Sequence, residues 1–322
     1  MPAYIEAIFR QAGHRGKSAL QALKRAPDGQ TRGAADKLTA IFPEKALPPL
    51  IMRCLGKFEV TVDGREIPSG SWRSLAAARL FKFLVLKTGQ GFVPKDILLE
   101  FLWPEENPEV TNKRFHVALS TLRRLLEPGL KRGVASAYIL RLNDAYRLET
   151  GPGGRIDFKA FLSEIDAADR IEKCDEAAAM NRYLAAESLH GGALLEEDLF
   201  VDAFISDRIL LQQCYLHVLS KLLHLFELNE NWTSCLSFAE KYLAIEPASE
   251  PVHCAIMRCY FALGETARIA AAFNRCRSLI TAELGTPPGP EVEQLYRHLM
   301  ETRFEASGPA SPARAYPRLI AD

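Results

Sequence analysis

No apolar run in the 322-residue sequence approaches the roughly 20 residues that a membrane-spanning helix needs. The first residues include the acidic Glu6 and offer no small-residue cleavage site, so they do not have the pattern of a secretory signal peptide. We therefore expect a cytoplasmic protein without a membrane partner.

Signatures of metal binding and catalysis are also missing. The seven cysteines form no CxxC pair, and no histidine pair accompanies them at zinc-finger spacing, which indicates reduced, buried thiols. No HExxH, GxSxG or Cys–His catalytic pattern occurs. Gly16-Lys17-Ser18 resembles the end of a phosphate-binding loop, but Gln11 stands where that loop requires glycine. We expect no enzyme activity, no metal and no cofactor.

Charge is distributed unevenly along the chain, although the formal net charge is zero. Residues 1–50 carry 8 lysines and arginines against 4 acidic residues, a balance of +4. Residues 51–150 carry 16 against 11, a balance of +5, and residues 151–322 carry 16 against 25, a balance of −9. A basic segment joined to an acidic one is typical of a polyanion-binding module attached to a module that contacts other partners.

Residues 51–150 are expected to form strands, three helices and a terminal hairpin, in that order. Apolar residues alternate up to Asp63-Gly64, a strong signal for a tight hairpin turn. Helical spacing follows, and Trp103-Pro104 and Pro128-Gly129 end the second and third helices. The expected helices span 75–86, 95–102 and 109–127, and the expected closing strands span 138–142 and 146–148.

The third helix, expected over 109–127, has two contrasting faces. At about 100° per residue, four apolar side chains form one core stripe: Phe115, Leu119, Leu122 and Leu126. The opposite face and its flanks combine cations, hydroxyls and one apolar side chain: Lys113, Arg114, His116, Val117, Ser120, Thr121 and Arg124. This mixture suits a DNA major groove. Cations can contact phosphates or guanine edges, hydroxyls can form hydrogen bonds to phosphates or bases, and an apolar group can contact a thymine methyl. A solvated helix face with one stray valine is the alternative.

A short basic hairpin with Arg141 and Arg147 follows this helix, and a recognition helix followed by such a hairpin is the winged-helix arrangement. Four ordered motifs over about 100 residues carry a family resemblance. NKRFHVALSTLRR resembles the recognition helix of the OmpR/PhoB-type winged-helix family, and YILRLNDAYRL resembles its wing. CLGKFEVTVDGREI and LLEFLWPE resemble the strands and second helix of that family as they occur in Streptomyces antibiotic regulatory proteins. Ala145 stands where the wing pattern has glycine, which puts the turn geometry in question.

The resemblance implies a sequence-specific DNA-binding transcriptional regulator, expected to be an activator, with double-stranded promoter DNA as its partner. The expected DNA-binding residues are Lys113, Arg114, His116, Val117, Ser120, Thr121, Arg123, Arg124 and, from the wing, Arg147. Arg123 is expected nearer the flank, against phosphate or an acidic neighbour. Two alternatives stay open: the winged helix could bind protein, which would make the chain an interaction scaffold, and a homodimer rather than a monomer could bind DNA.

Residues 155–305 are expected to be entirely helical. GALLEEDLFVDAF at 192–204 and AEKYLAIEP further on resemble the bacterial transcriptional activator domain, a tetratricopeptide-like array. In such an array, helical pairs complete their core only by stacking on neighbours. Small residues are expected where the helices cross: Ala239, Ala255, Ala262, Ala270 and Ala271. The resemblance implies a surface for RNA polymerase or another protein, and a rigid spacer is the alternative.

The predicted fold class is mainly α: an α+β winged helix over 51–150, then an all-α tetratricopeptide-like domain over 155–305. Residues 1–46 indicate short helices, and the proline-rich residues 306–322 indicate a flexible tail. The N-terminal helices could also be the end of a longer regulator with upstream modules, an alternative that the sequence leaves open.

Overall fold

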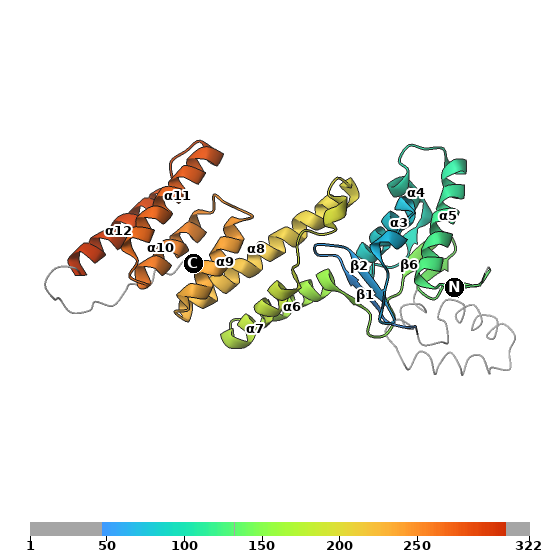
Figure 1. Cartoon of the computed structure of the whole chain (residues 1–322), viewed down its shortest axis with the longest axis horizontal. Coiled ribbons are helices and arrows are strands. Elements are labelled where there is room, and N and C mark those ends of the chain that lie inside the picture. The colour runs from blue at the N-terminus through green and yellow to red at the C-terminus, as the bar shows by residue number, and fades with distance from the viewer. Residues whose placement is uncertain (1–46, 132, 307–322) are drawn as a thin grey trace. The chain divides into compact units, whose positions relative to one another are not determined.

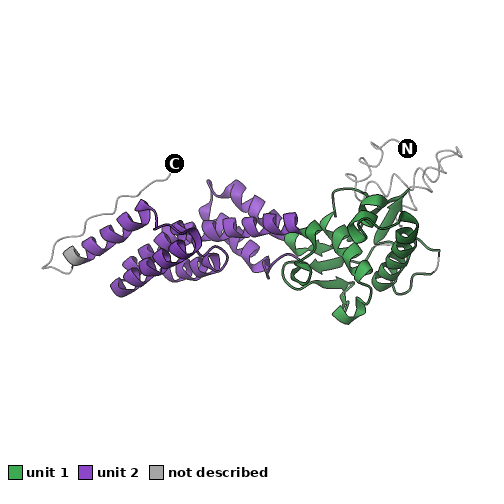
Figure 2. Ribbon diagram, turned by 90° about the horizontal axis from the view of Figure 1, so that it is seen from above, with its two compact units in different colours: residues 1–159, 195–204 green, residues 160–194, 205–322 purple. Residues whose placement is uncertain are grey.

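The computed structural model describes residues 47–131 and 133–306; the helices expected over 1–46 and the tail from 307 onward lie outside the described residues. The chain divides into two compact units, coloured separately in Figure 2. The first contains the described residues up to Lys159 together with Leu195–Phe204, which we name the strap. The second contains Ala160–Leu194 and the described residues from Ile205 onward. A segment from the helical half of the sequence is thus folded into the first unit.

A four-stranded sheet with the order β3-β2-β1-β7 belongs to the first unit. β1 (Leu50–Arg53) and β2 (Glu59–Val62) are antiparallel, and β3 (Arg65–Glu66) pairs with β2 through the Asp63-Gly64 turn. Both turn residues have positive φ, 51° and 74°, as this tight hairpin turn requires. β7 (Arg155–Ile156) lies parallel to β1, an addition that local sequence patterns did not predict.

Three helices follow close to the expected boundaries (Figure 1): α3 (Leu75–Leu86), α4 (Lys95–Leu102) and α5 (Pro108–Leu126). Side-chain caps start two of them. The Ser74 hydroxyl accepts the backbone N–H of Ala77 at 3.2 Å, and the Asn107 side chain accepts that of Glu109 at 2.8 Å. Proline at the first position of α5 suits a helix start, because its missing N–H would have no helical partner there.

A second, three-stranded sheet of order β4-β6-β5 closes the first unit. β5 (Ile139–Leu142) and β6 (Ala145–Leu148) form the expected hairpin, and β4 (Val93–Pro94) pairs with β6. Three helices followed by this hairpin make the first unit a winged helix. The left-handed residue of the wing turn is Asn143, with φ 54°, while Ala145 already pairs with Leu142 in the ladder. The turn therefore forms without a glycine at 145.

Aromatic side chains make the core of the first unit continuous. Trp72 stacks on Phe81 of α3 at 5.4 Å between ring centroids, and Phe58 lies 6.0 Å from Phe81. Phe115 of α5 meets Tyr146 of β6 edge to face at 5.2 Å, with both rings fully buried. Helix α5 and the wing therefore share one core and hold each other in position.

The strap is anchored at both ends by buried side chains and backbone bonds. Leu195 and Phe204 are almost completely buried, and the Phe204 ring lies 5.6 Å from that of Phe101 in α4. The backbone N–H of Leu195 donates to the carbonyl of Cys54 at 2.8 Å. These contacts join residues 141 and 103 positions apart in the sequence, so the strap is an integral part of the winged-helix unit.

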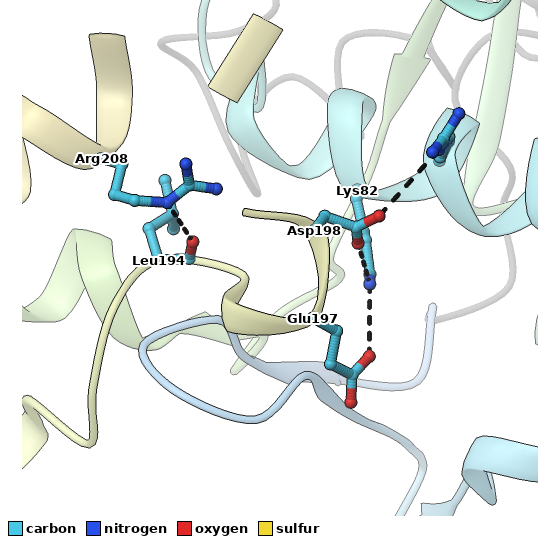
Figure 3. A network of polar contacts seen from close by, with 6 residues as sticks. Lys82, Leu194, Glu197, Asp198 and Arg208 are labelled. Carbon is cyan, nitrogen blue, oxygen red and sulfur yellow. Dashed lines mark hydrogen bonds and ion pairs between the residues drawn. The ribbon is translucent and has the colours of Figure 1, made fainter. Parts of the chain in front are cut away.

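A buried ion pair fixes the middle of the strap to α3, as Figure 3 shows. The Lys82 ammonium lies 2.5 Å from one Asp198 oxygen and 3.5 Å from Glu197, and 4.7 Å from the centroid of the Phe58 ring. The Lys82 and Asp198 side chains are only 7% and 10% exposed, whereas Glu197 is 48% exposed. Arg79 lies 4.0 Å from the other Asp198 oxygen. Two cations of α3 thus meet one buried carboxylate of the strap.

The second unit is helical throughout its regular structure. Its helices are α6 (Asp157–Ile171, with the first turn in the first unit), α7 (Glu176–Leu189), α8 (Ile205–Leu228), α9 (Trp232–Leu243), α10 (Glu250–Ala262), α11 (Thr266–Leu284) and α12 (Pro290–Ala306). Successive helices from α7 to α12 pack on one another, as expected for tetratricopeptide-like stacking. No helix in the described part of the chain is long and apolar enough to cross a membrane.

Small residues lie at some of the expected helix crossings but not at all of them. Ala239 and Ala255 are buried, as predicted. Ala262 and Ala271 are exposed, which corrects the prediction for these positions. In α11 the buried small side chains are Ala272 and Cys276 instead, because the helix turns that face toward α10 and α12.

Candidate nucleic-acid interface

Helix α5 buries one side completely. Phe115, Leu119, Leu122 and Leu126 are each no more than 3% exposed, which confirms the predicted core stripe. Because these residues recur at three- and four-residue spacing, the opposite side of the helix must point away from the core. The orientation of α5 therefore follows from its leucines.

The open side of α5 presents cations, a hydroxyl and an apolar group together. Val117 lies at the centre of this side and is 66% exposed, and Val110 in the first turn of the same helix is 45% exposed. Six of the residues predicted from the sequence are exposed here: Lys113, Arg114, His116, Val117, Ser120 and Arg124. The structure thus brings together most of the expected site on a single helix face.

Two of the arginines on this face are oriented by neighbouring groups. The Arg124 guanidinium donates to both the carbonyl and the hydroxyl of Ser120 at 3.4 Å, so its side chain lies back along the helix. Arg114 forms an ion pair with Glu106 at 2.5 Å, with both side chains well exposed. Exposed pairs of this kind are weak, so Arg114 can exchange Glu106 for another anion at little cost.

Positive groups from three elements converge beside the middle of α5. Partial burial, and then repulsion by Lys95 of α4 and Arg141 of β5, lower the pKa of His116. Both cations are close enough to His116 to act on its pKa, although burial is the largest cause and the Asp144 carboxylate opposes them. Lys95, which the sequence analysis did not select, and Arg141 therefore belong to the same basic surface as α5.

Three predicted residues have surroundings that differ from the open face. Arg123 is half-buried and donates to the carbonyl of Ile139 at 3.3 Å, and burial lowers its pKa. Thr121 is half-buried on the flank of the helix. Arg147 is 8% exposed and forms an ion pair with Glu149 at 2.5 Å.

The burial of Arg147 changes which wing residue is accessible. Its guanidinium also lies 4.6 Å from the centroid of the Phe92 ring, so packing and pairing hold it inside the unit. Arg141 has a side chain that is 52% exposed and pairs with Asp144 near the tip of the wing. Arg141 pairs with Tyr146 across the hairpin, whereas Arg147 pairs with Leu140, so the two arginine side chains point to opposite faces. The exposed cation of the hairpin is therefore Arg141, and Arg147 is buried.

The second half of the chain matches the model of a known domain family. The model of the bacterial transcriptional activator domain matches residues 156–300, from β7 to α12. The match therefore covers most of the described helical unit together with the strap.

Curated relatives extend the similarity over the winged helix. MoaR1, a transcriptional regulatory protein of Mycobacterium tuberculosis, is 25% identical over 257 residues, which cover 76% of this chain and 78% of MoaR1. EmbR, a transcriptional regulatory protein of Mycobacterium bovis, is 23% identical over 256 residues, 76% of this chain and 62% of EmbR. The chain is a transcriptional regulator, and it spans less than two thirds of EmbR.

A solved structure shares the fold of the regulator. The structure of Mycobacterium tuberculosis EmbR in complex with a low affinity phosphopeptide superimposes with a TM-score of 0.60 at 20% sequence identity. The similarity covers 79% of this chain and 66% of that one. The two proteins therefore share a fold over most of this chain.

Sequence reasoning missed the features of the regulator that depend on distant contacts. Lys95 gave no signal, because a lysine at the start of a short helix is ordinary. The strap lay inside a motif that the sequence analysis assigned to the helical domain, although its two buried hydrophobic ends and acidic middle were visible. Among the described residues, no three His, Cys, Asp or Glu side chains are grouped so as to hold a metal ion.

Proposed function

We propose that this regulator binds double-stranded promoter DNA by placing the open face of α5 in the major groove. One observation carries the proposal: α5 exposes cations, a hydroxyl and Val117 on the side opposite a fully buried apolar stripe. The mixture matches the chemistry of a groove edge, where phosphates, base acceptors and thymine methyls lie close together.

The roles of individual residues follow from their reach and surroundings. Three cations contact phosphates or guanine edges: Lys113, Arg114 and Arg124. Ser120 forms a hydrogen bond to a phosphate or to a base edge. His116 joins Arg141 in contacting the backbone where the wing approaches it. Thr121, Arg123 and Arg147 support the interface, with Arg123 holding β5 against α5.

The proposed DNA-binding part is residues 51–150 with the strap, and the proposed partner domain is residues 155–305 without it. Acting on promoter DNA places the regulator in the bacterial cytoplasm, where we expect it to activate transcription.

Selection from a pool of random duplexes tests the proposal directly. The full chain should enrich one sequence motif, and its affinity for that motif should fall steeply with salt, because each neutralised phosphate releases counterions. Enrichment of no motif, together with salt-insensitive or absent DNA binding, would contradict it. A protein-binding winged helix would then be the better interpretation.

Val117 offers a test at the level of a single methyl group. We expect that replacing one thymine of the selected site by deoxyuridine weakens binding about 4-fold, the value of one buried methyl at about 0.8 kcal/mol. In the Val117→Ser variant, the same replacement of thymine by deoxyuridine should cause no further loss of binding affinity. Equilibrium binding of both proteins to both duplexes measures this coupling. Equal costs of deoxyuridine at every thymine in the two proteins would mean that Val117 faces no thymine methyl.

A further inference from the structure

Phe200 is the most exposed large apolar residue among the described parts of the chain, at 97%. It lies in the strap between two short 3-10 turns, Glu196–Asp198 and Asp202–Phe204. A single exposed apolar residue on a mobile loop would be unremarkable. This one is held on a support that is fixed on both sides.

The supports of Phe200 leave its backbone little freedom. On one side Asp198 forms the buried pair with Lys82, and Leu195 is buried and bonded to Cys54. On the other side Phe204 is completely buried. Because ordering a side chain is a major cost of association, a preorganised apolar side chain is well suited to bind a partner.

We propose that Phe200 inserts into an apolar pocket of a protein of the transcription machinery whose pocket is rimmed by lysine or arginine side chains. Exposed carboxylates flank Phe200 on both sides, at Glu196, Glu197 and Asp202, and would face that basic rim. Large aromatic residues surrounded by polar groups are the usual anchors of protein interfaces. The inference rests on the proposed DNA binding, since the strap and α5 belong to one unit and the partner would be held at a set place on the promoter.

Charge argues against the other occupants of this surface. The carboxylates around Phe200 repel the phosphates of DNA, so DNA is not its partner. In a second copy of the chain, the basic surface of the described winged helix is the face of α5, which the proposed function assigns to DNA. A separate protein with a basic surface would not be repelled by these carboxylates and would leave α5 free to bind DNA.

The experiment compares the full-length protein with Phe200→Ser and with the control Leu75→Ser, which changes a leucine that is 61% exposed at the start of α3, in the same unit as the strap. The probe is RNA polymerase holoenzyme of the encoding bacterium, titrated onto the promoter duplex with each protein already bound. Phe200→Ser should weaken polymerase recruitment on the order of 30-fold or more, as loss of an aromatic anchor does. DNA affinity and thermal unfolding should match the wild type in both variants, and recruitment by Leu75→Ser should be normal.

A second variant tests the charges. Glu196→Gln with Asp202→Asn should weaken recruitment several-fold and reduce its dependence on salt, while DNA affinity stays normal. Recruitment that is equal in Phe200→Ser and wild type, or absent in the wild type, overturns the inference while DNA binding remains intact. Loss of a wild-type dimer on sedimentation of Phe200→Ser overturns it in favour of self-association. Failure of the wild type to bind any duplex identifies an error in the proposed function instead.

Discussion

Replacing Lys113 and Arg124 together by alanine should weaken promoter binding by this regulator about 100-fold without unfolding it. Each cation is expected to contribute about 1–3 kcal/mol to binding, and about 1.4 kcal/mol from each gives that factor. Both side chains are exposed on the side of α5 that points away from its leucines, so neither contributes to the core. The loss should therefore appear in binding alone.

The dependence of binding on salt shows what kind of contact is lost. Removing two phosphate contacts should reduce the slope of log Kd against log salt concentration by about 2. Loss of affinity at one base pair, with an unchanged slope, would instead indicate contacts to base edges. Fluorescence anisotropy on the selected duplex at several salt concentrations separates these two cases.

A matched control removes two charges from the same unit but not from α5. Lys57 and Arg73 are both exposed, and their double replacement by alanine lowers the net charge by the same amount. We expect at most a few-fold change in affinity from this control, through long-range attraction only. Equal losses in the two double variants would mean that DNA responds to the overall charge of the unit, and the assignment of α5 would be wrong.

Asp198→Ala should destabilise the winged-helix unit by about 3 kcal/mol, because it leaves the Lys82 cation buried without its nearest carboxylate. Lys82 is 7% exposed and cannot reach water without moving α3 or the strap. Glu197 lies 3.5 Å from the Lys82 ammonium but is half-exposed, so it compensates only in part for the lost carboxylate. We therefore expect the loss of unfolding free energy to fall at the lower end of the usual range of about 3–5 kcal/mol.

Two further variants separate the buried charge from other effects of the substitution. Glu197→Ala should cost less than about 1 kcal/mol, as expected for an exposed partner. Lys82→Met combined with Asp198→Ala should recover most of the lost stability, because no cation then remains in the core. The rescue would show that the uncompensated charge is the cause.

Urea unfolding can be followed in this unit alone. In a Trp232→Phe background, the two remaining tryptophans, Trp72 and Trp103, both lie in the first unit. The midpoint should fall for Asp198→Ala and return in the double variant. An unchanged midpoint for Asp198→Ala would mean that the strap detaches readily from α3 and is not part of the folded winged helix.

The partition between the two units illustrates how far sequence patterns reach. The boundaries of α3, α4 and α5 agree with the sequence to within a residue or so, because caps, prolines and apolar spacing act over a single helical turn. The core stripe of α5 followed from the same local rule. The pairing of β7 with β1 did not, because two residues carry too little pattern to identify a partner a hundred positions away.

The candidate interface shows the same limit at the level of single side chains. Lys113, Val117 and Arg124 could be placed on the open face from helix geometry alone. Arg147 could not be told apart from Arg141, since both are arginines in one short hairpin. Only the packing of Arg147 on Phe92 and its pairing with Glu149 decided that it is buried.

By itself, the sequence determined the amphipathic helices, the hairpin turns and the order of the two modules, all of which arise from interactions between near neighbours. The tertiary structure alone decided that a ten-residue strap joins the winged helix, that the Lys82 side chain pairs with Asp198 there, and that Phe200 is left exposed. These features depend on burial and charge pairing between distant segments. Such pairing is a property of the folded chain, because its free energy appears only when both partners leave water together.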